Sequence, residues 1–231
     1  GAGKSQLVLQ LMLRVQLPYE YGGFQGGAIF LHSDSANFMP AVKRLQVLAD
    51  AFAREHASLG ATAGRLMDAI SIMQVDDAET LEAVLKNETP ALLLAKPVRL
   101  IVIDSIGALF RTHGDDGGAT TRAQQQAERA QMLFAISARL KKLSDVQDVA
   151  IVITNQVTDK PLDALGEKHA PAYELSACRV PGDGHSVRVP ALGLVWSHCV
   201  NTRLILTRHQ EVCAPQPAAP TPFPGARSHS I

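Results

Sequence analysis

The sequence is poor in cysteine. It has three, Cys178, Cys199 and Cys213, which are widely spaced and form no C-x-x-C pair. An odd and scattered set excludes a disulfide scaffold, argues against a zinc site and indicates a reducing compartment. We therefore expect the fold to depend on an apolar core, which a chain of 231 residues with 46% hydrophobic residues is long enough to form.

Excess charge of one sign and long hydrophobic runs are also absent. Lys plus Arg and Asp plus Glu each number 22, so the protein has no overall positive field with which to attract nucleic acid. Any contact with DNA must come from a local patch or from a partner. The longest apolar stretch, residues 91–103, is interrupted by Lys96, Pro97 and Arg99, and it falls short of the ~20 apolar residues of a membrane span. No membrane partner is expected.

What the sequence does contain begins at its first residue. Gly1-Ala2-Gly3-Lys4-Ser5 matches the second half of a phosphate-binding loop, G-x-x-x-x-G-K-[ST]. Such a loop points backbone N–H groups at a polyphosphate, and its lysine adds a positive charge while its hydroxyl can ligate Mg²⁺. We expect the first glycine of the loop and the strand that leads into it to precede Gly1, so that the fold lacks its first strand here.

Strand and helix patterns alternate along the chain. Buried strands are predicted at 28–32, 69–75, 100–103, 149–153, 192–196 and 202–206, and helices at 7–15, 41–54, 78–85 and 123–138. Residues 158–190 show little periodicity and are expected to form a long mobile loop. The pattern predicts an α/β fold with a mostly parallel, twisted sheet and helices on both faces. It places one core domain at 1–209 and a proline-rich, disordered tail at 210–231.

Polar residues follow the predicted strands at their carboxyl ends. Asp34 ends the first of these strands, Asp104 follows four apolar residues, and Gln156 follows a later strand. In parallel α/β folds these ends share one edge, which is where ligands bind. Together with Lys4 and Ser5 they describe a P-loop ATPase with an acid that anchors Mg²⁺.

Several stretches give a closer resemblance. They are Gly3-Lys4-Ser5-Gln6-Leu7, Gln16-Leu17-Pro18, 100–106, Leu109-Phe110-Arg111, 151–157, 190–196 and Asn201-Thr202-Arg203-Leu204. On these residues the chain resembles the ATPase core of the RecA-type strand-exchange recombinases and, within them, the eukaryotic recombinase paralogues. The resemblance covers roughly residues 1–208, and it implies a RecA-type P-loop NTPase core.

The resemblance implies a set of site residues. The ATP-binding residues would be Gly1, Gly3, Lys4, Ser5, Gln6 and Asp104, with Ser5 and Asp104 holding Mg²⁺. Gln156 would sense the γ-phosphate. The family has a glutamate that polarises the attacking water where this chain has Asp34, one methylene shorter. A base that is misplaced by about 1 Å can cost on the order of 10²-fold in rate, so we expect a DNA-dependent ATPase with slow or absent hydrolysis.

The resemblance also implies partners and a cellular role. The expected function is double-strand break repair by homologous recombination in a complex with another recombinase paralogue. The expected location is the nucleus, with the cytoplasm as an additional one. The two loops that would contact single-stranded or branched DNA, about 111–122 and 158–190, carry as many acidic as basic residues or nearly so, which favours contact with DNA through the complex. Two alternatives are a non-catalytic interaction subunit with a vestigial nucleotide site and another RecA-core ATPase, such as a ring helicase.

Overall fold

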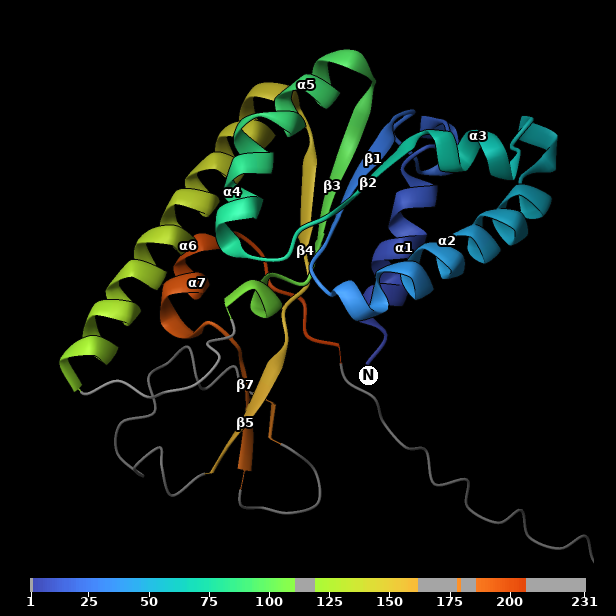
Figure 1. Ribbon diagram of the computed structural model, residues 1–231. Helices are drawn as coiled ribbons and strands as arrows, with labels where there is room; N and C mark the ends of the chain where they lie inside the picture. The colour runs from blue at the N-terminus through green and yellow to red at the C-terminus, as the bar shows by residue number, and fades with distance from the viewer. Residues whose placement is uncertain (1, 111–118, 162–177, 180–185, 207–231) are drawn as a thin grey trace, which may run out of the picture.

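A parallel β-sheet forms the centre of the molecule. The computed structural model describes residues 2–110, 119–161, 178–179 and 186–206. The sheet has the order β2-β1-β3-β4 (Figure 1), and all its pairs are parallel. Its strands are β1 (Gly27–His32), β2 (Ile70–Gln74), β3 (Val98–Asp104) and β4 (Ala150–Ile153). Each lies within two residues of a predicted strand, because continuous Val, Ile and Leu runs suit strands that are covered on both faces.

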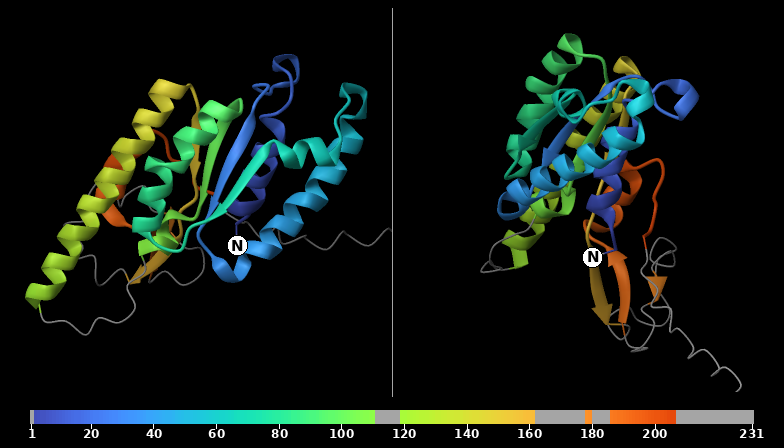
Figure 2. Two further views of the ribbon diagram at one scale, coloured as in Figure 1. Left: turned by 45° about the horizontal axis from the view of Figure 1, so that its top comes forward. Right: turned by 90° about the vertical axis from the view of Figure 1, so that its right-hand side faces the viewer.

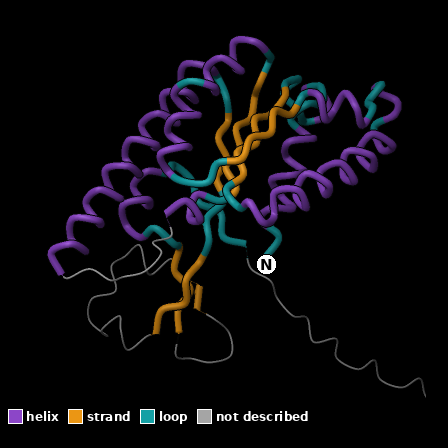
Figure 3. Tube along the Cα trace, in the orientation of Figure 1, coloured by secondary structure: helices purple, strands orange, loops and turns teal. Residues whose placement is uncertain are grey.

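Helices cover both faces of this sheet, as predicted (Figures 1 and 2). One face carries α1 (Lys4–Arg14), α2 (Ser35–Glu55) and α3 (Ala63–Asp68); the other carries α4 (Ala78–Lys86), α5 (Glu88–Ala95), α6 (Ala119–Gln147) and α7 (Gly193–Cys199). Short 3₁₀ turns occur at η1 (Tyr19–Tyr21), η2 (Ala57–Leu59) and η3 (Ile106–Phe110). Figure 3 shows the alternation of helix and strand along the chain.

The core has two layers, one on each face of the sheet, because alternate residues of a strand face opposite sides. Ile29 and Leu31 of β1 pack with α4, α6 and α7, whereas Ala28 and Phe30 pack with α1, α2 and α3. All four side chains are fully buried. Successive strand residues point to opposite faces, so one strand serves both layers and its carboxyl end is held rigidly.

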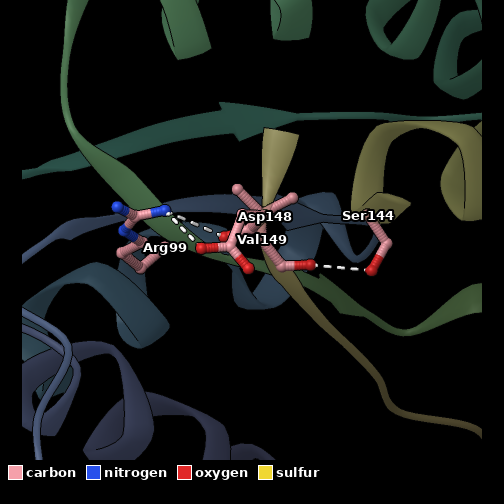
Figure 4. A network of polar contacts seen from close by, with 4 residues as sticks. All are labelled: Arg99, Ser144, Asp148 and Val149. Carbon is pink, nitrogen blue, oxygen red and sulfur yellow. Dashed lines mark hydrogen bonds and ion pairs between the residues drawn. The ribbon is translucent and has the colours of Figure 1, made fainter. Parts of the chain in front are cut away.

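Polar contacts stabilise the amino edge of the sheet (Figure 4). Arg99 Nη1 donates to the Asp148 carboxylate at 2.9 Å and to the Asp148 carbonyl at 3.2 Å. Ser144 Oγ donates to the Val149 carbonyl at 2.9 Å. These contacts join the start of β3 to the turn between α6 and β4, away from the carboxyl edge.

A second, antiparallel sheet replaces part of the predicted mobile loop. Residues 158–190 were expected to lack regular structure, but β5 (Val157–Pro161), β6 (Cys178–Arg179) and β7 (Ser186–Pro190) pair in the order β5-β7-β6. β5 and β7 both end in a proline, and charged residues interrupt any apolar run between them. No strand pattern was therefore visible in this part of the sequence. Residues 162–177 and 180–185 lie outside the described residues.

The two late strands were predicted wrongly. Residues 192–196 fall largely within the helix α7, and 202–206 form no regular element. A five-residue apolar run fits a strand or a helix equally well. The helix is decided by tertiary packing, which buries Trp196 and Cys199 three residues apart against α6, and by Ser197 Oγ, which donates to the Gly193 carbonyl at 3.0 Å.

Helix boundaries and some helices also differ from the prediction. α2 begins at Ser35 rather than at residue 41, and α3 and α5 were not predicted. Within α6, Leu133, Ile136 and Leu140 are buried, whereas Phe134 is 52% exposed. Gly1, residues 111–118 of the first predicted DNA loop and the tail 210–231 lie outside the described residues. Among the described residues, no helix is long and apolar enough to span a bilayer.

The start of α4 allows a test of one capping interaction. Asp77 accepts from the Thr80 N–H at 2.6 Å, and its hydrogen bonds to Thr80 lower the pKa of the Asp77 carboxyl. Asp77→Ala should lower the free energy of unfolding at pH 7 by about 1 kcal/mol. Because the pKa of the carboxyl is lower in the folded state, its contribution is present above the unfolded pKa and is lost as pH falls. Urea titrations at pH 7 and pH 3 should therefore show a smaller difference at pH 3, and an equal difference at both would contradict this.

Candidate functional site

The polar residues predicted from the sequence meet at the carboxyl edge of the parallel sheet. β1 and β3 are parallel, with His32 opposite Asp104 in register, so their last residues share this edge. Figure 1 places the N-terminus at the same edge, close to the start of α2. The structure thus brings α1, Asp34 and Asp104 to one side of the molecule.

The first turn of α1 has the local geometry of an anion site. Gly3 is the N-cap with φ of 90°, and nothing lies within 4 Å of the position where a Cβ would stand. Only glycine adopts this left-handed conformation without strain. The first turn contains no acidic residue, and within the described chain no side chain caps it. Its free backbone N–H groups and the helix dipole therefore favour a bound anion, beside the half-buried Lys4 and the exposed Ser5.

Asp104 is held at the end of β3 by two neighbouring strands. Its side chain is only 8% exposed and accepts a hydrogen bond from Thr154 Oγ1 at the end of β4. Ser33 at the end of β1 donates its N–H to the Asp104 carbonyl at 2.9 Å. Ser33 Oγ also donates to the Ser105 carbonyl at 2.7 Å and accepts from the Ser105 N–H at 2.8 Å. A carboxylate that is held in this way can ligate a divalent cation directly or through a water molecule.

Asn155 and Gln156 connect this edge to the second sheet. Asn155 Nδ2 donates to the Ala191 carbonyl at 2.7 Å, and the Ala191 N–H donates to the Gln156 carbonyl at 2.8 Å. A Cβ on Gly107 would stand 2.8 Å from Asn155 Oδ1, so only glycine fits there. Gln156 is half-buried at the junction of β4 and β5, a place from which a change at the site can reach the β5-β7-β6 sheet.

Asp34 is the N-cap of α2. Its Oδ1 accepts from the Asn37 N–H at 3.3 Å and its Oδ2 accepts from Asn37 Nδ2 at 2.7 Å. The hydrogen bond from the Asn37 side chain is the main cause that lowers the pKa of this exposed carboxyl. Its backbone N–H donates to His32 Nδ1 at 3.2 Å. A lowered pKa makes a weaker general base; whether Asp34 acts on water stays a prediction.

One residue of this edge was missed from the sequence. Arg44 Nε on α2 donates to Gln6 Oε1 on α1 at 3.2 Å. This hydrogen bond places an exposed guanidinium beside Gln6, which lies two residues after Lys4 in α1. Nothing in the local sequence distinguishes Arg44 from its neighbour Lys43, because which of the two contacts α1 depends on how α1 and α2 pack. Gln6, a predicted ATP-binding residue, is therefore in contact with a second cation.

The donor set indicates which kind of metal the site can hold. Among the described residues, no group of three or more His, Cys, Asp or Glu side chains is arranged to bind a metal ion. Mg²⁺ commonly binds through one or two protein oxygens together with phosphate oxygens and water. The Ser5 hydroxyl and the Asp104 carboxylate fit that mode, in which the phosphates of a nucleotide complete the coordination.

Thr154 should stabilise the buried carboxylate of Asp104. Thr154→Val removes the hydroxyl donor and leaves a buried carboxylate short of a partner, which should lower the free energy of unfolding by about 1–3 kcal/mol. Thr154→Ser keeps the hydroxyl and is the matched control. Urea denaturation of the three proteins measures the effect, and equal losses in both variants would show that packing of the Thr154 methyl matters instead.

Comparisons with known proteins identify the family of the chain. The model of the Rad51 family matches residues 1–212. The DNA repair protein XRCC3 homolog of Arabidopsis thaliana is 34% identical over 218 residues, which covers 90% of this chain and 66% of that protein. XRCC3 of Mus musculus is 31% identical, covering 91% of this chain and 56% of that protein. RadA of Halobacterium salinarum is 30% identical over 198 residues.

These relatives bear on the resemblance drawn from the sequence. Three features of the sequence resemble one paralogue in particular, the third of the X-ray repair cross-complementing group. They are Gln16-Leu17-Pro18, Trp196 and Asp104-Ser105-Ile106. XRCC3 proteins are among the relatives found. The chain spans between 56% and 66% of the length of these XRCC3 proteins.

Proposed function

The chain belongs to the Rad51 family, and on that premise we propose that it binds ATP with Mg²⁺ at the first turn of α1 and acts in homologous-recombination repair of DNA. Membership of this RecA-type family implies nucleotide binding with a divalent metal ion. The observation that carries the proposal is the uncapped first turn of α1, with Gly3 in the left-handed conformation, at the same edge of the sheet as Asp104.

Each residue has a distinct part in this proposal. Backbone N–H groups after Gly3 and the Lys4 ammonium bind the phosphates, and Gln6 is oriented by Arg44. Ser5 and Asp104 hold Mg²⁺, which when bound neutralises charge on the phosphate oxygens. Thr154 holds the Asp104 carboxylate, and Ser33 holds the backbone of Asp104 and Ser105. Gln156 responds to the terminal phosphate and passes the change to β5.

We propose that hydrolysis is slow. A general base must reach the attacking water and have a suitable pKa, whereas the hydrogen bonds from Asn37 hold the Asp34 carboxylate at the start of α2 and lower its pKa. The same observation favours a second candidate function, an interaction subunit in which nucleotide stabilises the structure without turnover. Tight binding of Mg-ATP with no release of phosphate would select this second candidate.

The proposed partners are another recombinase paralogue and, through the resulting complex, single-stranded or branched DNA in the nucleus. Support comes from the relatives of the chain, which include the DNA repair proteins XRCC3 and RAD51 homolog 2. The zero net charge of the chain gives no general attraction for DNA, which is why the complex rather than this chain alone is proposed to bind it.

A repair assay tests the proposal in the intact protein. Cells that lack the protein should regain recombination of a broken reporter gene when the wild type is supplied, and co-precipitation should recover another recombinase paralogue. The Lys4→Ala variant, expressed at the same level, should restore less recombination. Full restoration by Lys4→Ala would contradict a role for the nucleotide, and failure of the wild type to restore any would contradict the role in repair.

A further inference from the structure

A buried histidine stands at the carboxyl end of β1, beside the start of α2. The side chain of His32 is only 4% exposed, and its backbone lies opposite Gln74 of β2 and Asp104 of β3. Alternate residues of a strand point to the same face of a sheet, so His32 lies on the face where Phe30 packs with α1 and α2. A buried imidazole needs a hydrogen-bond partner, and the partner here is the backbone of Asp34.

Two kinds of contact join this ring to the first turn of α2. Nδ1 of His32 accepts the backbone N–H of Asp34 at 3.2 Å, so the neutral ring carries its proton on Nε2 in this arrangement. The ring also meets Phe38 of α2 and Phe30 of β1 edge to face, with centroids 5.9 Å and 5.4 Å away respectively. Aromatic rings attract each other in this geometry, so the imidazole holds the turn by both packing and hydrogen bonding.

The backbone that carries His32 is itself held by both neighbouring strands. The His32 carbonyl accepts the Val75 N–H at 3.0 Å, and the N–H of the next residue, Ser33, donates to the Asp104 carbonyl at 2.9 Å. The imidazole therefore stands on a fixed part of the sheet. Because the ring is fixed, the Asp34 N–H that it accepts is fixed as well.

The Asp34 carboxylate is consequently restrained in two ways. Its oxygens accept from the backbone N–H and the side-chain amide of Asn37, and its own backbone N–H is bound by His32. A base must approach the attacking water closely, and an error of about 1 Å can cost on the order of 10²-fold in rate. Each restraint keeps the carboxylate at the cap of α2 and limits its approach to that water.

We propose that His32 is a positioning residue, which holds Asp34 in the capping position by accepting its N–H and packing against Phe38, and which thereby keeps ATP hydrolysis slow. The inference rests on the proposed function, because it takes Asp34 to lie beside the bound nucleotide. It adds that the sheet restrains Asp34 as well as Asn37 does. Histidine suits this part because its ring supplies an aromatic surface and an acceptor together, whereas phenylalanine and asparagine each supply only one of them.

Two substitutions separate the acceptor from the ring. His32→Phe keeps the aromatic contacts and removes Nδ1, whereas His32→Asn keeps an acceptor oxygen at the same place in the side chain and removes the ring. Hydrogen exchange at the Asp34 amide in the intact protein, without nucleotide, should be about 2- to 10-fold faster in His32→Phe, the scale of one hydrogen bond. His32→Asn should keep the protection of the wild type. Equal exchange in His32→Phe and the wild type would overturn the proposal.

Single-turnover release of phosphate with saturating Mg-ATP tests the effect on the reaction. His32→Phe should raise the rate by about three- to tenfold, again the scale of one hydrogen bond. Its affinity for Mg-ATP should not change, because the restraint acts on the base and not on the phosphate-binding turn of α1, whereas general damage to the fold would lower rate and affinity together. His32→Asn should keep the wild-type rate. Release by His32→Phe that is no faster than that of the wild type, including no release by either, would overturn the proposal.

Two controls show whether the effect passes through Asp34. His56→Phe makes the same substitution at the other end of α2, where the histidine ring lies 4.4 Å from that of Phe52, and it should change neither the rate nor the exchange at Asp34. In the Asp34→Asn protein, His32→Phe should no longer raise the rate. A gain in either control would overturn the proposal. Failure of the wild type to bind Mg-ATP would refute the proposed function and this inference with it, whereas equal amide exchange refutes the inference alone.

Discussion

Replacing Lys4 with alanine should lower the affinity for Mg-ATP by about 10- to 150-fold. A hydrogen bond to a charged group contributes about 1.5–3 kcal/mol, and each 1.4 kcal/mol is a factor of ten in affinity. Lys4 lies in the first turn of α1 after Gly3, where backbone N–H groups alone cannot neutralise a triphosphate. Isothermal titration of the intact protein with Mg-ATP measures the change.

Lys43→Ala is the matched control for this loss. Lys43 is an exposed lysine on α2, so its removal changes net charge equally without touching the first turn of α1. The affinity of this variant for Mg-ATP should stay within about twofold of the wild type, as expected for an exposed charge that solvent and salt screen. Equal losses in both variants would show a general field effect, and no loss in Lys4→Ala would remove this residue from the site.

Replacing Asp34 with glutamate should raise the rate of ATP hydrolysis by about 10- to 100-fold. Asp34 is bound to Asn37 at 2.7 Å as the cap of α2, and glutamate is a poorer N-cap whose carboxylate reaches one methylene further. A shift of about 1 Å toward the attacking water can change the rate on the order of 10²-fold. Single-turnover phosphate release with saturating Mg-ATP measures this rate, while the affinity should remain unchanged.

Asp34→Asn provides the control for the cap. Asparagine caps helices as well as aspartate does, so thermal stability should be retained while the carboxylate is lost. Any residual hydrolysis should then disappear. If Asp34→Asn hydrolyses ATP as fast as the wild type, Asp34 is not the base; if Asp34→Glu gives no gain, the distance of the carboxylate is not what limits turnover.

Much of the central sheet and of the site follows from local sequence. The runs 28–32 and 100–103 are apolar over their whole length, and this is sufficient to identify strands covered on both faces. Because those strands are parallel, the polar residues that follow them, Asp34 and Asp104, must reach the same edge. The glycine before Lys4 permits a left-handed conformation, and the structure gives Gly3 a φ of 90°.

Other features depend on contacts between distant parts of the chain and could not be predicted. The run 192–196 becomes helical because Trp196 and Cys199 bury against α6. The bond of Arg44 to Gln6 requires the packing of α1 on α2. The capping of α2 by Asp34 was not predicted, because the helix was expected to begin at residue 41 and begins at Ser35, and nothing in the sequence showed that both carboxylate oxygens bind Asn37.

Hydrogen exchange of the intact protein, with and without Mg-ATP, tests the location of the nucleotide most directly. The account predicts slower exchange in the peptides that cover residues 3–9, 101–107 and 153–157, which meet at the carboxyl edge of the sheet. Exchange in residues 16–27 and 59–66, at the amino edge, should not change. Protection at the amino edge alone, or no protection at saturating nucleotide, would contradict the placement of the site at the first turn of α1.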